Sequence, residues 1–289
     1  MRYAFFVSVV WGTTFLVSKG VLVSGVSPET LTMLRFVMAY AILSVLCRLS
    51  RRHSCESCHV SLTDEVLFAL IGVTGGSGYF LLEYSALQHT SAADVGLITS
   101  AVPLLTTAIL AFWRHQRPTR SFVAATLLAT LGVALVVTGG AKADAQSSLL
   151  GDLLAVGDLL AWTAYTILLV HLEARFPPLF VARRLFLWAT VTLAPFWLLN
   201  DGIGNLCLAS HAVASIAYLG AVASALCVWL WGVATERLGP QRTSLFLLLM
   251  PVVALIASAL VCPDELSFWN VTGALLVITG IALSEKLFV

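Results

Sequence analysis

Four ionisable side chains stand inside long apolar stretches of the sequence: Lys19, Arg35, Glu83 and Asp158. A charge in the interior of a lipid bilayer costs at least about 2.5 kcal/mol on insertion scales, so such a residue usually faces a cavity or a partner. The predicted helix directions place all four at a similar depth, near the outer side of the membrane. Two bases and two acids can neutralise one another, which predicts an outer gate or the outer wall of a substrate site.

A structural role is the alternative for these residues. Lys19 and Arg35 are close enough to the interface for their charged ends to reach the headgroups. Asp158 caps its helix instead if that helix begins later than predicted. The shorter side chain of Glu83 reaches the headgroups less easily, which favours a role in a site.

Aromatic rings share helix faces with these charges. By helical spacing, the shared faces combine Trp11 with Phe15 and Lys19, Tyr79 with Glu83, and Asp158 with Trp162 and Tyr165. Trp11 and Trp162 occupy comparable places in the two halves, which predicts two indoles near a common axis where an apolar or zwitterionic metabolite would stack. The alternative is that these rings pack helices or mark the membrane interface.

The composition sets the class of protein that must position these residues. Of 289 residues 59% are hydrophobic and 11% charged, and the mean hydropathy is +0.95. A soluble domain of this length is far less apolar, so the chain is predicted to be an integral membrane protein.

Ten apolar stretches are predicted to span the membrane. They cover residues 3–22, 30–47, 67–87, 95–113, 121–138, 153–170, 185–199, 212–233, 245–261 and 268–283. Several are shorter than the roughly 20 residues that cross a typical hydrocarbon core, which suits a compact bundle. The first stretch lacks a small-residue cleavage pattern and carries Lys19, so it is predicted to be a retained helix rather than a signal peptide.

The second half of the chain repeats the first. An ungapped offset of 148 residues places Pro103 on Pro251 and the run from Gly132 on the run from Gly280. A unit with an odd number of spans must enter the membrane from the other side when it is duplicated. The predicted fold class is therefore an all-α integral membrane protein of ten transmembrane helices, arranged as two inverted five-helix repeats. The predicted repeats are residues 1–139 and 151–289.

The basic residues predict the orientation. If the amino terminus is cytoplasmic, 13 of the 16 basic residues lie inside, Lys142 lies outside, and Lys19 and Arg35 lie within spans. The inside residues are Arg2, Arg48, Arg51, Arg52, Arg114, Arg117, Arg120, Arg175, Arg183, Arg184, Arg237, Arg242 and Lys286. This asymmetry predicts a multi-pass protein of the bacterial inner membrane with both termini in the cytoplasm.

The paired prolines predict moving parts. Pro103 and Pro251 each remove a backbone hydrogen bond and are expected to kink the fourth and ninth helices. A matched pair of kinks in inverted halves would serve as hinges, whereas packing without a mechanical role is the alternative.

One short segment has the residues of a metal or haem site. Cys55-Glu56-Ser57-Cys58-His59 matches the haem attachment pattern, but the surrounding arginines place it in the cytoplasm, where covalent haem attachment does not occur. A zinc or redox site of His53, Cys55, Cys58 and His59 stays open, although an ordinary reduced loop is favoured. We therefore expect no cofactor and no metal.

Motifs spread over nearly the whole chain indicate a family. In the first half they are Trp11-Gly12 with Phe15 and Lys19, Ser27-Pro28, Leu34-Arg35-Phe36, the run Ala86 to Ala92, Pro103 and Gly132. In the second half they are Trp162, Tyr218-Leu219-Gly220, Pro251, Glu265 and the run Gly273 to Gly280. In their order and spacing the chain resembles an EamA-type member of the drug/metabolite transporter superfamily.

This resemblance implies a ten-helix fold with a central substrate cavity, and amino acids or related compounds as substrates. It also shows a departure, because such proteins often carry a glutamate after the fourth helix of each half. Glu265 fits the second copy, whereas the first reads Gln116-Arg117.

The predicted function is secondary transport or facilitated movement of a small metabolite across the inner membrane, in the outward direction, by alternating access. No nucleotide-binding lysine loop is visible in the sequence, so ATP-driven pumping within this chain is not expected. The expected partners are a small-molecule metabolite and membrane lipid, with no nucleic acid, and the oligomeric state stays open. One alternative is an intramembrane enzyme acting on a lipid with Glu83, Asp158 and His89 as acid/base groups. A passive scaffold is the other.

Overall fold

Helices account for almost all of the described chain, because a backbone surrounded by lipid must satisfy its hydrogen bonds within the segment. The computed structural model describes residues 1–50, 60–90, 92–113, 118–138, 148–200, 210–261 and 267–286, and no strand occurs within these ranges. The zinc or haem hypothesis for residues 53–59 lies outside them, as do residues 116–117 and 265.

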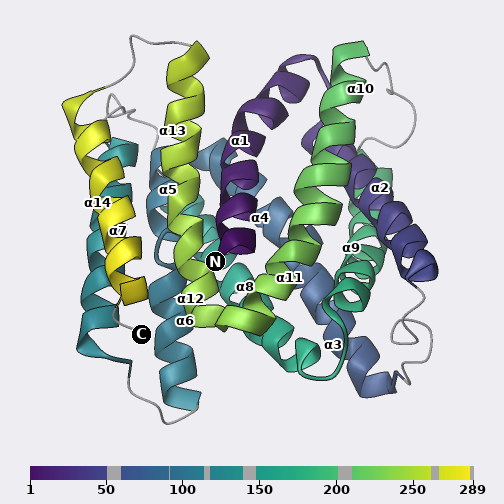
Figure 1. The fold of residues 1–289 in the computed structure, drawn as a ribbon. Coiled ribbons are helices and arrows are strands. Elements are labelled where there is room, and N and C mark those ends of the chain that lie inside the picture. The colour runs from purple at the N-terminus through teal and green to yellow at the C-terminus, as the bar shows by residue number, and fades with distance from the viewer. Residues whose placement is uncertain are drawn as a thin grey trace.

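Each half of the chain contributes five spans (Figure 1). The first half contains α1 Arg2–Val23, α2 Pro28–Leu49, α3 Leu62–Gly72, η1 Val73–Ser77, α4 Gly78–His89, α5 Ala92–Thr99, α6 Val102–Trp113 and α7 Arg120–Thr138. The second half contains α8 Leu149–Glu173, α9 Pro178–Asn200, α10 Ser210–Ala217, η2 Tyr218–Leu226, α11 Cys227–Leu238, α12 Pro240–Leu245, η3 Phe246–Leu248, α13 Leu249–Val261 and α14 Phe268–Lys286.

The spans are longer than the apolar stretches predict. Among the described residues, eight helical segments are long and apolar enough to cross a membrane, and Val102–Trp113 and Phe268–Leu283 are shorter apolar helices. The predicted stretch 153–170 is a helix from Leu149 to Glu173, capped by Ser148, whose Oγ accepts a hydrogen bond of 3.2 Å from the backbone N of Gly151. Polar capping residues extend a helix beyond the apolar stretch that hydropathy detects, which explains the difference.

Contacts between helix ends show that the second repeat is inverted. The third span begins at α3, where Asp64 pairs with Arg175 just beyond the end of α8. It ends at α4, where Thr90 Oγ1 donates a 2.9 Å hydrogen bond to Asp152 Oδ1 at the start of α8. The third span is therefore antiparallel to α8. Since it runs parallel to α1 in the up-and-down bundle, the first spans of the two repeats point in opposite directions (Figure 1).

The third span of each repeat is interrupted at matching positions, by a kink at Gly76 within η1 in the first repeat and by the π-helical segment η2 in the second. Close to each turn a glycine lets the second span of the other repeat approach. A Cβ on Gly72 would lie 2.5 Å from Trp188 Cβ of α9, and a Cβ on Gly220 would lie 2.7 Å from Met38 Sδ of α2. The two repeats therefore interlock through equivalent crossings.

The fifth spans of the two repeats, α7 and α14, pack directly against each other. A Cβ on Gly132 would lie 2.6 Å from the carbonyl oxygen of Gly273, and a Cβ on Gly280 would lie 2.7 Å from that of Ala125. Asn270 Nδ2 donates a buried 2.7 Å hydrogen bond to the Val136 carbonyl. Small residues thus bring the two backbones together, as is common between membrane helices.

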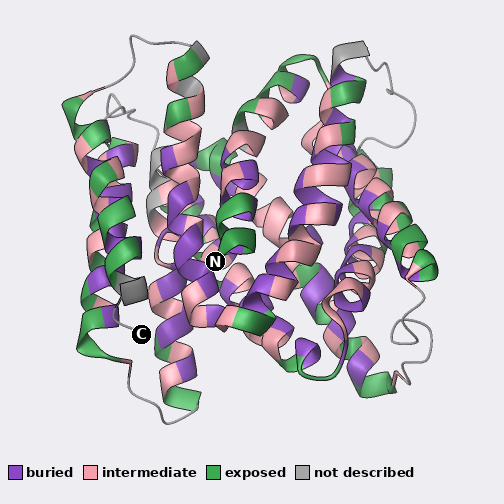
Figure 2. Ribbon diagram, in the orientation of Figure 1, coloured by how far each residue is buried: buried purple, intermediate pink, exposed green. Residues whose placement is uncertain are grey.

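Large apolar side chains cover the outside of the bundle. Exposed examples include Phe112, Leu199 and Leu260, and Figure 2 shows exposed residues along the outer faces of α2 and α14. An apolar exterior of this kind is stable in lipid rather than in water. Asp158 and Arg35, considered below, are buried in the interior of the bundle.

Candidate functional site

Aromatic rings from four spans meet in the interior of the bundle. The ring centroids of Trp11 and Trp162 lie 5.6 Å apart in an edge-to-face arrangement, as the repeat symmetry predicts. Trp162 also lies 5.0 Å from Tyr79 of α4 and 5.0 Å from Tyr165, centroid to centroid. The centroid of the Trp231 ring of α11 lies 5.1 Å from that of Trp11. We call these five rings the aromatic cluster.

A buried carboxylate without a partner stands on the same face of α8. Asp158 is 0% exposed, and neither of its carboxylate oxygens has a hydrogen-bond partner among the described residues. The indole nitrogen of Trp162, one helical turn further along, is also buried and lacks a partner within the described ranges. Buried polar groups are normally paired, so an acceptor and a donor left open together indicate a place for a ligand. Asp158 is the tenth residue of α8 and is therefore not a helix cap.

A second acid and an arginine lie next to this pair. Tyr79 lies one helical turn before Glu83 on α4, and Glu83 interacts electrostatically with both Arg35 and Asp158. Arg35 is only 6% exposed. Its Nε donates a 3.0 Å hydrogen bond to Ser224 Oγ. Three of the four predicted intramembrane charges are thus brought together.

Arg35 is held by more than its charge partner. Its guanidinium carbon lies 4.8 Å from the centroid of the Phe80 ring, a cation–π contact, and Ser224 belongs to η2. The guanidinium therefore links the second span of one repeat to the third span of the other.

The remaining residues predicted for the α1 face lie apart from this group or are not described. Lys19 is exposed near the end of α1, and no ion pair involving it occurs among the described residues. The side chain of Phe15 is outside what the structure describes. The proposed part of both residues in substrate binding stays a prediction.

Both predicted hinge prolines stand where a helix is interrupted. Pro103 is buried in the first turn of α6, directly after the turn that separates α6 from α5. Pro251 lies in the first turn of α13, directly after the 3₁₀ turn η3. Proline cannot donate to the carbonyl four residues earlier, so the helix begins anew at these points. Their action as hinges is a prediction.

Trp231 and Ser224 are missing from the predicted site. The sequence contains a signal for Trp231, because the repeat offset of 148 residues makes its position equivalent to that of Glu83. No comparable signal marks Ser224, whose hydroxyl reaches Arg35 only through the crossing of α2 with η2.

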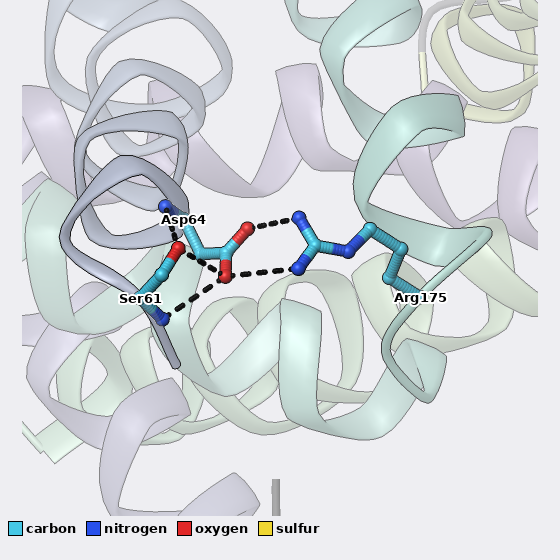
Figure 3. A network of polar contacts seen from close by, with 3 residues as sticks. All are labelled: Ser61, Asp64 and Arg175. Atoms are coloured by element: carbon cyan, nitrogen blue, oxygen red, sulfur yellow. Dashed lines mark hydrogen bonds and ion pairs between the residues drawn. The ribbon is translucent and has the colours of Figure 1, made fainter. Parts of the chain in front are cut away.

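Two ion pairs join the repeats at the end of the bundle where α8 connects to α9. Figure 3 shows that both terminal nitrogens of the Arg175 guanidinium point toward the Asp64 carboxylate. The distance from Nη2 to Oδ2 is 3.2 Å. Asp64 Oδ2 also accepts hydrogen bonds from the backbone N of Ser61 at 3.0 Å and from Ser61 Oγ at 2.7 Å. This reciprocal capping box fixes the start of α3 and orients the carboxylate toward Arg175.

The neighbouring residue forms the second pair. Glu65 Oε1 accepts hydrogen bonds from Arg184 Nη1 at 2.9 Å and from the indole nitrogen of Trp188 at 3.1 Å. The arginine distribution predicts Arg175 and Arg184 only as residues of an inner loop. The structure shows in addition that both tie α3 to the second repeat.

Comparison with known proteins identifies the family. The sequence profile of the EamA-like transporter family matches residues 1–138 and again residues 149–285. The chain belongs to the EamA-like transporter family. It is thus a multi-pass membrane transporter of the drug/metabolite transporter superfamily, built from two EamA domains, and the family is one of transporters rather than enzymes. The lipid-enzyme alternative is therefore wrong.

Relatives of this EamA-like transporter cover most of its length. An uncharacterized transporter of Archaeoglobus fulgidus is 25% identical over 94% of this chain and 93% of its own length. A probable amino-acid metabolite efflux pump of Salmonella typhimurium is 25% identical over 97% of this chain and 93% of its own. A probable terminal-alkyne amino-acid exporter of Streptantibioticus cattleyicolor is 28% identical, with coverages of 77% and 74%.

A solved crystal structure has the same fold. It superposes with a TM-score of 0.83 at 20% sequence identity, covering 99% of this chain and 97% of that chain. The ten-helix architecture described above is therefore shared by an experimentally determined protein.

Proposed function

We propose that this EamA-like transporter exports a small metabolite that carries an ammonium and a carboxylate group, an amino acid or a close relative. The observation that carries this proposal is the unpaired Asp158 carboxylate beside the unpaired indole nitrogen of Trp162. A buried carboxylate without a hydrogen bond is costly, and an ammonium group of a substrate supplies the missing charge and donors.

The surroundings of Asp158 suit both ends of a zwitterion. Faces of the aromatic cluster attract an ammonium group through cation–π interaction, next to the acids Asp158 and Glu83. Arg35 provides the positive group that would hold a carboxylate, and its partner Ser224 adds a hydroxyl. The names of the Salmonella and Streptantibioticus relatives, an efflux pump and an exporter for amino-acid compounds, support the same substrate class and the outward direction.

Alternating access follows from the inverted repeats. Exchange of the conformations of the two halves would expose one central site first to one side and then to the other. The interruptions at Pro103 and Pro251 supply places where helices bend, and the ion pairs of Asp64 and Glu65 tie the repeats together at the α8–α9 end. Breaking and remaking these pairs would accompany each cycle.

The proposed location is the bacterial inner membrane, with both termini in the cytoplasm. The concentration of arginines at the connections between α8 and α9 and between α11 and α12 supports this orientation. A membrane-impermeant thiol reagent applied to intact cells tests it with single cysteines added at the two ends of the chain. Labelling of either end before the membrane is broken would contradict the proposed orientation.

Flux through proteoliposomes tests the transport proposal. A panel of labelled amino acids and their analogues is offered to wild type, to Asp158→Asn and to Asp152→Asn as the matched control on the same helix. The control keeps an acceptor oxygen for Thr90, whereas the first change removes the buried charge. We expect substrate-specific flux in the wild type and the control, and loss of flux in Asp158→Asn. Equal flux in all three proteins would refute the site, and a lack of flux for every compound would refute the function.

The same vesicles answer the question of coupling. Flux that responds to an imposed pH gradient indicates proton exchange, and flux that follows only the substrate gradient indicates facilitation. The substituted proteins are compared under both conditions.

A further inference from the structure

A second buried carboxylate lies near the opposite end of α8. Glu173 stands in the last turn of the helix and is 8% exposed. Neither Oε1 nor Oε2 has a hydrogen-bond partner among the described residues, and no ion pair within the described ranges includes it. It lies fifteen residues beyond Asp158, which corresponds to about 22 Å along a helix axis, so it is separate from the site described above.

A glycine of α11 packs directly against this carboxylate. Gly232 of α11 faces Glu173 Oε1, and a side chain at that position would collide with the carboxylate oxygen. The preceding residue, Trp231, is fully buried, and its indole nitrogen also lacks a partner in the described part of the chain. The residue before the glycine that contacts Glu173 therefore also carries a polar atom without a partner among the described residues.

The local charge is negative. Glu236, one turn further along α11, acts electrostatically on Glu173, and Tyr165 faces it from its own helix. The nearby base, Arg175, is engaged by Asp64. No ion pair among the described residues includes Glu173 or Glu236, so the local charge favours a cation.

We propose that Glu173 forms a second binding site, which takes the ammonium group of the transported molecule at the α8–α9 end of the bundle. The proposal rests on the proposed function, because it concerns the same substrate class. The chemistry matches an organic ammonium, because a buried carboxylate without a hydrogen-bond partner among the described residues supplies a charged acceptor.

The two sites are connected by rings. The ring centroids of Trp231 and Trp11 lie 5.1 Å apart, and those of Trp11 and Trp162 lie 5.6 Å apart. Trp162 is one helical turn from Asp158. A row of ring contacts thus runs from Trp231, the residue before Gly232, toward Asp158. If the arginines lie in the cytoplasm, Glu173 is the first site that an exported substrate reaches.

Carbodiimide labelling tests the site directly in the purified full-length protein. Dicyclohexylcarbodiimide forms a stable adduct with carboxyl groups in apolar surroundings, and peptide mass spectrometry locates the adduct. The probe is ethylammonium chloride, with sodium chloride and 1-propanol as controls for ionic strength and for a neutral molecule of similar size. Glu173→Gln confirms the assignment of the peptide.

We expect an adduct at Glu173 that ethylammonium reduces by more than half and that neither control reduces. The protection should persist in Asp158→Asn, because the two sites are separate. Absence of an adduct under all conditions would show a carboxylate closed to small molecules and would overturn the proposal. An adduct that ethylammonium leaves unchanged would identify a structural acid and would also overturn it.

Flux separates this proposal from the proposed function. In proteoliposomes Glu173→Gln should raise the KM for an amine substrate about tenfold from the α8–α9 side, as expected for loss of a hydrogen bond to a charged group. Glu236→Gln, which removes the exposed acid, should change the KM by less than threefold. Normal flux with an unchanged KM in Glu173→Gln refutes only the second site, whereas absent flux in the wild type refutes the transport function.

Discussion

The two tryptophans at the centre of the bundle are predicted to respond differently to the same substitution. Trp11 Nε1 donates a buried 2.8 Å hydrogen bond to the Ala223 carbonyl within η2, whereas Trp162 Nε1 has no partner among the described residues. Replacement of either indole by phenylalanine keeps an aromatic ring and removes one N–H group. The loss of ring area is nearly the same at both positions and cancels in the comparison.

The difference comes from the hydrogen bond. Trp11→Phe removes a buried hydrogen bond to the Ala223 carbonyl, which costs about 1 kcal/mol or more. Trp162→Phe removes a donor that is already unpaired, so its cost should be about 1 kcal/mol or less. At about 2–4 °C per kcal/mol for a chain of a few hundred residues, Trp11→Phe should unfold several degrees below Trp162→Phe.

Thermal unfolding of both variants in the same detergent measures this difference, and substrate binding measures the other half of the prediction. Trp162→Phe should weaken binding with little loss of stability, because its nitrogen is open to a ligand. Trp11→Phe should lower the unfolding temperature first. Equal unfolding temperatures, or a lower one for Trp162→Phe, would refute the assignment of a structural bond to Trp11 and an open donor to Trp162.

Three further predictions concern the framework around the site. Asp64→Asn and Arg175→Gln should each increase the reactivity of a cysteine introduced beside the α8–α9 connection. The double variant should increase it little further, because each single change already breaks the same ion pair. Additive effects of the two changes would contradict this. Gly132→Ala places a Cβ 2.6 Å from a backbone oxygen and should destabilise the protein by about 1–3 kcal/mol, whereas Gly96→Ala meets only ordinary contact and should leave the unfolding temperature unchanged. Pro251→Ala should lengthen α13 toward η3 and slow flux without loss of stability. Transport rates and unfolding temperatures measure the two effects. Undiminished flux would show that Pro251 is not a hinge.

Much of the fold can be predicted from the sequence, because lipid imposes simple rules on a chain. The length of each apolar stretch limits it to one crossing, and the matching of Pro103 with Pro251 shows the duplication. The same symmetry argument correctly predicts that Trp11 and Trp162 meet. Helix ends are predicted less well, since caps such as Ser148 lie in polar sequence that hydropathy does not detect.

The site is predicted only in part, because contacts between distant helices leave no local pattern. Spacing on one helix places Tyr79 with Glu83, but not Arg35 with Ser224, which meet through the crossing of two repeats. Lys19 shares a helical face with Trp11 by spacing and is nevertheless exposed, which spacing along one helix does not reveal. An inner-loop assignment based on charge alone does not reveal that Arg175 has a buried partner.

Equilibrium binding to the purified protein tests the central claim most directly, because it needs neither a gradient nor an orientation. A titration compares an amino acid that the vesicles transport with its analogue lacking the amino group, in wild type and in Asp158→Asn. The wild type should bind the amino acid and not the analogue, and Asp158→Asn should weaken binding of the amino acid at least about tenfold. Equal affinity of both proteins for the amino acid, or equal affinity of the wild type for both compounds, would contradict an ammonium site at Asp158.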